Sequence, residues 1–379
     1  MKKRSLGIIP ACLLSGAAMA QGSVTLYGLI DQGIDYTNNA GTGAAWKMQS
    51  GDGLSSRWGL KGTEDIGSGL HAIFTLENGF DGSSGLLSQP NRIFGRQAFV
   101  GVSSDQIGTL TFGRQYDSVV DFVAPLTANG NWGGYLFSHP LDNDNTDDTF
   151  RVSNSVKYLS NSYGGFTFGG VYGFSNQEGA FANNRAYSVG TQYSAGPLTA
   201  AAAFMSIDNP GANSGGALPS DDGSFVATRE RVWTAGINYT VFEAATLGFV
   251  YSHTDLKNPV SSVYVGAFAN SPDSMKFDNY EFNAKYQFNQ AFYAGAMYTY
   301  THAKVAAAAG DSSPSWHQAG LMVDYNLSKR TDVYAQAVYQ KLTGNSTGSV
   351  LDTALILGAA APSSSTNQVV VRVALRHQF

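Results

Sequence analysis

The amino-acid sequence predicts an all-β protein: a transmembrane antiparallel β-barrel of sixteen strands. Three observations support this fold class. First, only 13% of the residues are charged, below the ~25% of ordinary soluble domains, whereas 44 are Gly, 22 Phe and 20 Tyr. Second, short segments alternate apolar and polar side chains, which hides a membrane strand from hydropathy windows because only every second residue faces lipid. Third, the connections between these segments alternate between short and long.

The first twenty residues have the pattern of a signal peptide. Three basic residues at positions 2–4 precede an apolar stretch, and Ala18-Met19-Ala20 fits the small-x-small cleavage pattern before Gln21. The single cysteine, Cys12, lies in this segment, so the exported chain would fold without disulfides. We therefore expect residues 1–20 to be removed and residues 21–379 to form one barrel domain.

Sixteen segments have the period-two alternation of a strand, and most approach the ~9–11 residues that cross a bilayer at a tilt. They are 23–36, 46–62, 68–80, 92–103, 108–115, 149–160, 165–175, 184–195, 197–208, 228–240, 244–255, 275–289, 291–303, 315–327, 331–343 and 366–379.

The connections indicate an up-and-down barrel. Those at 195–197, 289–291 and 328–330 are tight, whereas those at 209–227, 256–274 and 344–365 are long. Tight turns on the periplasmic side and long loops on the extracellular side give this rhythm. An even number of strands also lets the first and last strands pair, which leaves no open edge.

The final segment shows two faces most clearly. Val369, Val371, Val373, Leu375 and Phe379 fall on one side, and Gln368, Arg372, Arg376 and Gln378 on the other. Because arginine is costly in hydrocarbon, we expect the second face to line a wet lumen.

The segment 116–148 has neither strand nor helix periodicity. A structureless connection of this length inside a compact domain is usually functional or disordered. Its apolar residues, among them Phe122, Trp132 and Phe137, predict that it packs against another part of the chain. Its charged residues are all acidic: Asp117, Asp121, Asp142, Asp144, Asp147 and Asp148. We expect the rest of the chain to form a wall around this loop.

Several motifs give the chain a family resemblance. They are SVTLYG at 23–28, SSRWGLKGTEDIGSGL at 55–70, FGRQAFVGV at 94–102, GTLTFGRQYD at 108–117, and the terminal Phe379. With them, the chain resembles the sixteen-stranded trimeric general porins of Gram-negative outer membranes, most closely the β-proteobacterial type. The resemblance implies a homotrimer in the cell outer membrane, in contact with lipid including lipopolysaccharide. It also implies that 116–148 is the third loop, folded into the lumen as a constriction.

The resemblance further implies residue roles. By motif, Arg57, Arg96 and Arg151 would form the basic wall of the constriction, to which we also assign Lys61 on the face of Arg57, and Glu77 would be an acidic residue of the constriction beside them. Asp117 and Asp121 would be the acidic residues of the constriction, and Asp142, Asp144, Asp147 and Asp148 would form a cluster in the outer vestibule. A further wall position that is basic in some porins is Leu29 here, which argues against strong anion selectivity. Arg114 falls by parity on the outward face. There it would either contact a neighbouring subunit or belong to the point where the chain already turns into the loop.

The function expected from this reading is passive general diffusion of ions and small hydrophilic solutes, limited by size and biased by charge at the constriction. The alternative is a substrate-specific channel for small anionic metabolites. An outer-membrane enzyme is disfavoured, because the G-x-S-x-G string at 344–348 lies in a Gly/Ser-rich loop with no helix after it. A soluble secreted β-protein is disfavoured by the strand pattern. We expect no cofactor and no metal site, and a pI of 5.6 gives no reason to expect nucleic-acid binding.

Overall fold

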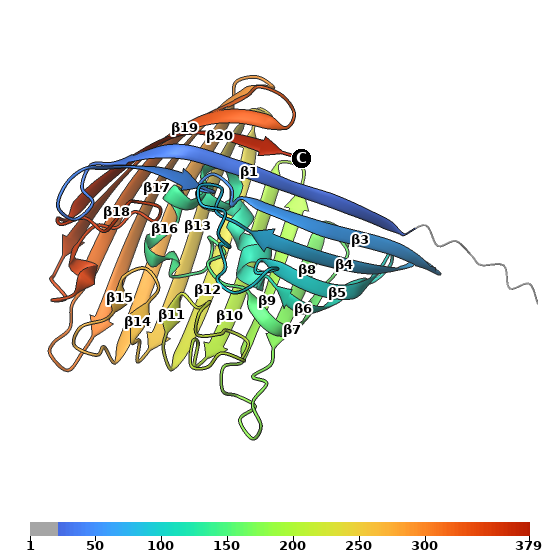
Figure 1. Cartoon of the computed structure of the whole chain (residues 1–379), viewed down its shortest axis with the longest axis horizontal. Helices are drawn as coiled ribbons and strands as arrows, with labels where there is room; N and C mark the ends of the chain where they lie inside the picture. The colour runs from blue at the N-terminus through green and yellow to red at the C-terminus, as the bar shows by residue number, and fades with distance from the viewer. Residues whose placement is uncertain (1–21) are drawn as a thin grey trace, which may run out of the picture.

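The computed structural model describes residues 22–379, which form a closed antiparallel barrel of 16 strands (Figure 1). The predicted signal peptide at 1–20 lies outside the described residues. The predicted fold class is confirmed. Within residues 22–379, no helix is both long enough and apolar enough to cross a membrane.

Each barrel strand pairs with its neighbours in the sequence. The strands are β1 (Ser23–Thr37), β3 (Arg57–Gly67), β4 (Leu70–Gly79), β5 (Gln97–Ser104), β6 (Gly108–Gln115), β7 (Val152–Leu159), β8 (Phe166–Gly173), β9 (Ala186–Ala195), β10 (Leu198–Asp208), β12 (Arg229–Val241), β13 (Ala245–Lys257), β16 (Ser274–Gln287), β17 (Phe292–Ala306), β18 (Pro314–Asn326), β19 (Thr331–Gly344) and β20 (Asn367–Gln378). The barrel closes because β1 pairs with both β3 and β20.

The predicted strand at 46–62 is wrong in its middle. The structure contains β2 (Ala45–Ser50), which pairs with the second half of β1, and then β3, with residues 51–56 between them. Gly51 has a φ of +86°, which favours glycine, and the chain turns inward so that Asp52 and Ser56 are buried. The predicted strand at 92–103 also begins later, at Gln97. The first departure places the polar residues Asp52 and Ser56 inside the barrel.

The two faces of the wall follow the predicted alternation. On β20, Arg372 is fully buried on the inner face, whereas Val373 and Leu375 are exposed on the outer face. On β1, Asp31 and Asp35 lie inside and Ile30 and Ile34 outside. Charged groups therefore line the lumen, and apolar groups cover the outside.

The long connections carry small elements of their own. Three two-residue strands, β11 (Phe225–Val226), β14 (Ser261–Ser262) and β15 (Gly266–Ala267), form a separate sheet from two of these loops. A short 3₁₀ helix, η6 (Val350–Asp352), lies in a third. These loops gather at the lower edge of the barrel in Figure 1.

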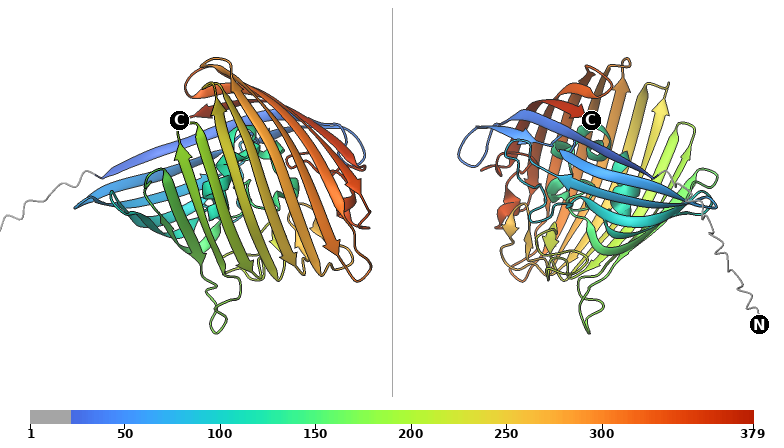
Figure 2. Two further views of the ribbon diagram at one scale, coloured as in Figure 1. Left: turned by 180° about the vertical axis from the view of Figure 1, so that it is seen from behind. Right: turned by 45° about the vertical axis from the view of Figure 1, so that its right-hand side comes forward.

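The segment 116–148 lies inside the barrel (Figures 1 and 2). It is not structureless, as its sequence suggested, but consists of five short helical turns. These are η1 (Val119–Val123), η2 (Ala124–Leu126), η3 (Asn129–Gly133), η4 (Tyr135–Phe137) and η5 (Pro140–Asp142). No turn is long enough to show helical periodicity in the sequence. We call residues 116–148 the inner loop.

Candidate pore constriction

The apolar side chains of the inner loop pack against the inner face of the wall. Phe122, Leu126, Trp132, Leu136 and Phe137 are all buried. The first two join a cluster formed with β8 to β13, and the other three join a cluster formed with β17 to β20. The predicted apolar anchors therefore do pack against another part of the chain, namely the wall of the barrel.

Four glycines of the wall make room for these anchors. Phe122 lies over Gly190 of β9, Leu126 over Gly236 of β12, Trp132 over Gly295 of β17, and Phe137 over Gly320 of β18. A Cβ added at Gly295 would lie 2.5 Å from Cε3 of Trp132, well inside the ~3.5–4.0 Å of a normal carbon contact. The pattern of inward glycines is therefore complementary to the side chains of the loop. We call these four positions the glycine seats.

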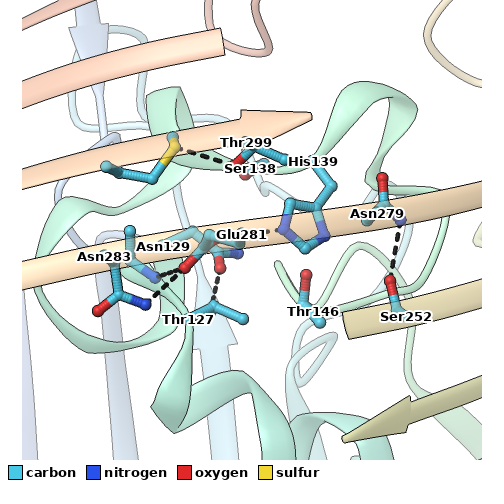
Figure 3. A network of polar contacts seen from close by, with 12 residues as sticks. Thr127, Asn129, Ser138, His139, Thr146, Ser252, Asn279, Glu281, Asn283 and Thr299 are labelled. Atoms are coloured by element: carbon cyan, nitrogen blue, oxygen red, sulfur yellow. Dashed lines mark hydrogen bonds and ion pairs between the residues drawn. The ribbon is translucent and has the colours of Figure 1, made fainter. Parts of the chain in front are cut away.

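A polar network also holds the inner loop to the wall (Figure 3). Glu281 of β16 accepts a hydrogen bond from the backbone N–H of Ala128 at 2.7 Å, and its other oxygen lies 3.1 Å from Nε2 of His139. Nδ1 of His139 lies 2.7 Å from Asp144, to which Ser252 of β13 also donates. This network links the middle and the C-terminal part of the inner loop to two strands.

Electrostatics fix the charge state of this network. Burial opposes the protonated form of His139, but Asp144 and Glu281 outweigh that effect and raise its pKa to about 10. Burial likewise opposes ionisation of Asp144, and the contact with His139 reverses this and lowers the pKa of Asp144. At neutral pH the His139–Asp144 pair is therefore a buried imidazolium against a carboxylate.

The three predicted arginines lie around one cavity of about 630 Å³ between the wall and the inner loop. Arg96 donates through Nε to Glu77 at 2.8 Å and through Nη2 to the hydroxyl of Tyr116 at 2.6 Å. Arg151 lies over the ring of Tyr116, 5.2 Å from its centroid. Tyr116, which the sequence reading did not single out, thus contacts two of the three arginines.

The acidic residues that line this cavity are Asp147 and Asp148 of the inner loop, together with Asp52 and Asp81. Asp148 lies 2.6 Å from Arg151 and 3.3 Å from Arg96, so this one carboxylate forms ion pairs with two guanidinium groups. Arg57 forms no ion pair within residues 22–379. Burial, followed by repulsion from Asp142, raises the pKa of Asp147 well above its ordinary value. The three arginines of this cavity thus have two carboxylates as ion-pair partners within residues 22–379, Asp148 and Glu77.

The other predicted acidic residues lie elsewhere. Asp117 is buried and accepts hydrogen bonds from the N–H of Val119 and from Asn145, and burial raises its pKa to about 6. Asp121 forms an ion pair with Lys157 of β7.

The cluster expected in the outer vestibule is divided in the structure. Asp142 and Asp144 are buried within the inner loop, and burial, together with Asp144, raises the pKa of Asp142 to about 7. Asp147 and Asp148 line the cavity instead. No periodicity in the loop sequence could have separated these four carboxylates.

The remaining predicted residues lie outside the cavity. Lys61 is exposed, with Nζ 5.4 Å from the centroid of the Tyr27 ring. Arg114 is buried and pairs within the chain with Asp222 at 2.6 Å, so its guanidinium has a partner without a neighbouring subunit. Leu29 is buried and lies directly opposite Arg57 on the paired strand.

The structure contains a second charged cluster, which the sequence analysis did not predict. Arg372 of β20 contacts Asp31 and Asp35 of β1, each at 2.8 Å, and Asp52 of the inward segment at 3.5 Å. The backbone oxygen of Asp52 accepts a hydrogen bond from Tyr135 of the inner loop at 2.6 Å. The closing seam of the barrel is thereby connected to the inner loop. Among residues 22–379, no group of three or more His, Cys, Asp or Glu side chains is arranged to hold a metal ion.

Comparison with known proteins gives consistent matches. A family model described as Gram-negative porin matches residues 8–345. An outer membrane porin of Bordetella pertussis is 33% identical over 90% of this chain and 94% of its own. Outer membrane porin protein 32 of Delftia acidovorans is 27% identical over the full length of both chains. The solved structure of an anion-selective porin from Comamonas acidovorans superposes with a TM-score of 0.73 at 24% identity, covering 95% of this chain and all of that one.

Proposed function

The chain belongs to the Gram-negative porin family and is an outer-membrane porin, and from this premise we propose which residues set its selectivity. The constriction is the cavity between the basic wall of Arg57, Arg96 and Arg151 and the inner loop carrying Asp147 and Asp148. Ions and small hydrophilic solutes pass through it by size exclusion, with a charge bias toward anions. Charged side chains facing a narrow pore are a common basis of such selectivity.

The observation that carries this proposal is the ion pairing of the three arginines, which outnumber the carboxylates in contact with them. Between them, the three arginines contact one loop carboxylate, Asp148, and one wall carboxylate, Glu77. Arg57 has no ion-pair partner within the described chain, and the raised pKa of Asp147 reduces the negative charge of the loop. A relative described as an anion-selective porin supports the same sign of bias.

The test is the reversal potential of single channels under a salt gradient. Replacing Arg57, Arg96 and Arg151 by Gln should shift the selectivity toward cations. A control variant replaces Lys329 and Arg330 by Gln. Both are exposed in a turn and neither lines the cavity, so this variant should keep the selectivity of the wild type. An unchanged reversal potential in the triple variant would show that the selectivity is set elsewhere.

A second candidate is a channel specific for small anionic metabolites. The mixed lining of the cavity favours it, because Tyr116, Tyr135 and Tyr264 stand beside the arginines. Saturable block of the ionic current by one small anion, at concentrations where others pass freely, would select this candidate over general diffusion.

We expect the assembly to be a homotrimer surrounded by outer-membrane lipid that includes lipopolysaccharide. A protein of the same fold, the outer membrane protein OmpT of Vibrio cholerae, has been described in a trimer form. Light scattering on the detergent-solubilised protein, corrected for bound detergent, measures the number of chains directly.

A further inference from the structure

The long loop 258–273, between β13 and β16, carries one side chain to the pore. Its strands β14 and β15 form a hairpin with Tyr264 at the tip, and β14 also pairs with β11 of the preceding long loop. Phe268, just after β15, is buried and stacks on Phe225 with ring centroids 6.4 Å apart. The hairpin is therefore held at its base, and Tyr264 at its tip lines the same cavity as the three arginines.

The hydroxyl of Tyr264 is the outer end of a chain of hydrogen bonds. It lies 2.6 Å from Oγ1 of Thr149, the first residue after the inner loop, and this Oγ1 donates to Oδ2 of Asp142 at 2.5 Å. The two oxygens of Asp142 also accept backbone N–H groups, from Asp147 at 2.9 Å and from Thr149 at 3.2 Å, so this carboxyl is the acceptor. Because Thr149 has one hydroxyl proton and donates it to Asp142, Tyr264 is the donor to Thr149. The hairpin is thus tied to the inner loop by a chain with a fixed direction.

The backbone held by this chain is strained. Asp148, which directly precedes Thr149, has a φ of +56°, and Asp142 and Asn145 have φ values of +41° and +58°. Residues other than glycine are uncommon in this left-handed region, and such conformations persist only where the surrounding contacts hold them. On one side of Asp148, its N–H donates to the backbone oxygen of Asn145 at 3.2 Å, and on the other side stands the bonded hydroxyl of Thr149. The conformation of Asp148 therefore depends on where Thr149 is held.

We propose that Tyr264 is a positioning residue of the constriction, which holds Asp148 against the arginine wall through Thr149. This inference deepens the proposed function and rests on it, because it takes Asp148 to offset the charge of the arginines in the pore. Without the hydroxyl of Tyr264, Thr149 loses its link to the hairpin and the strained backbone relaxes. Asp148 then spends less time on the two guanidinium groups that it contacts. The selectivity of the pore thus depends on a loop outside the constriction loop itself.

The experiment measures the reversal potential of Tyr264→Phe in planar bilayers under a salt gradient. This variant keeps the ring and removes only the hydroxyl. An ordinary hydrogen bond changes an equilibrium by about two- to tenfold, so the population in which Asp148 leaves the arginines should rise by about that factor. The reversal potential should therefore shift toward anions, in the same direction as in Asp148→Asn but by less.

The matched control is Tyr163→Phe. It removes a hydroxyl that donates to the backbone oxygen of Gln106 at 2.8 Å, and Tyr163 does not line the cavity. This control should keep the reversal potential of the wild type. Thr149→Val, which interrupts the same chain of hydrogen bonds in its middle, should shift the reversal potential in the direction of Tyr264→Phe.

A double variant separates positioning from a general structural effect. In the background of Asp148→Asn, adding Tyr264→Phe should change nothing further, because no carboxylate remains to be positioned. If Asp148→Asn shifts the reversal potential and Tyr264→Phe does not, or if the two effects add, the inference is overturned while the proposed function stands. A shift of Tyr264→Phe toward cations would overturn it as well. If neither single variant shifts the reversal potential, the proposed role of Asp148 and this inference fail together.

Discussion

Gly295→Val should release the inner loop from the wall without unfolding the barrel. The atoms nearest to a Cβ at Gly295 all belong to the ring of Trp132, at 2.5 to 2.8 Å. The ring must therefore retreat by at least about 1 Å for the first carbon and further for the two methyl groups. Because valine favours strands, the wall itself should tolerate the change.

The expected size of the effect follows from the burial of Trp132, whose side chain is 5% exposed. A buried aromatic ring covers ~150–250 Å², and at ~25 cal/mol per Å² its packing contributes about 4–6 kcal/mol. Phe137 packs edge-on to Trp132 with centroids 5.1 Å apart, so displacement of one ring disturbs the other. A loss of this size is enough to populate undocked conformations of the inner loop.

Single-channel recording in planar bilayers is the assay. The variant should show strong open-channel current fluctuations and a reversal potential closer to zero than that of the wild type. Limited proteolysis should cut the inner loop faster, while the barrel stays resistant. In the background of Trp132→Ala, which removes the clashing ring, adding Gly295→Val should change little. A quiet current in Gly295→Val, or additive effects of the two substitutions, would refute the reasoning.

Three further predictions concern charge. Arg57→Gln alone should shift the reversal potential toward cations more than Arg151→Gln does, because Arg151 already contacts Asp148; equal shifts would contradict this. Asp148→Asn should increase anion selectivity, since it frees two guanidinium groups, and an unchanged reversal potential would count against that role. Raising the pH from 5 to 10 should increase open-channel fluctuations. The pKa values of Asp117 and Asp142 are raised to about 6 and 7, so their contribution to docking of the inner loop on the wall is complete below the ordinary carboxyl pKa and is lost as the pH rises through these values. His139, whose pKa is raised to about 10, loses its favourable charge near pH 10. Fluctuations that decrease with pH would refute the sign.

The wall could be predicted from the sequence because the alternation within each strand shows which side chains face inward and which face outward. Period-two alternation placed Arg372 inside and Val373 outside without knowledge of any neighbour. The family motifs identified Arg57, Arg96 and Arg151, and the structure brings these three together around one cavity. Local pattern and motif were sufficient wherever the backbone is a regular strand.

The inner loop could not be resolved in the same way. Its turns are too short for periodicity, so the choice between Asp117 and Asp148 as the cavity carboxylate depends on contacts with distant strands. The break at 51–56 also has a tertiary cause, because Asp52 turns inward toward Arg372. The cluster of Arg372 with Asp31 and Asp35 could have been predicted. All three side chains fall on the inward faces of the first and last strands, and pairing these strands brings the opposite charges together.

The glycine seats explain how a loop rich in buried carboxylates keeps one position inside a wet lumen. Polar contacts alone would be weak there, because water competes for every exposed hydrogen bond. Packing of Phe122, Leu126, Trp132 and Phe137 into positions that lack a side chain is directional. A shift along the strand would bring each of these side chains onto a neighbouring residue that is not glycine. The wall therefore sets the register of the loop, and the His139 network can then form in a water-excluded space where its charges interact strongly. On this view the position of Asp148 opposite the arginines is a consequence of four missing side chains on the far wall.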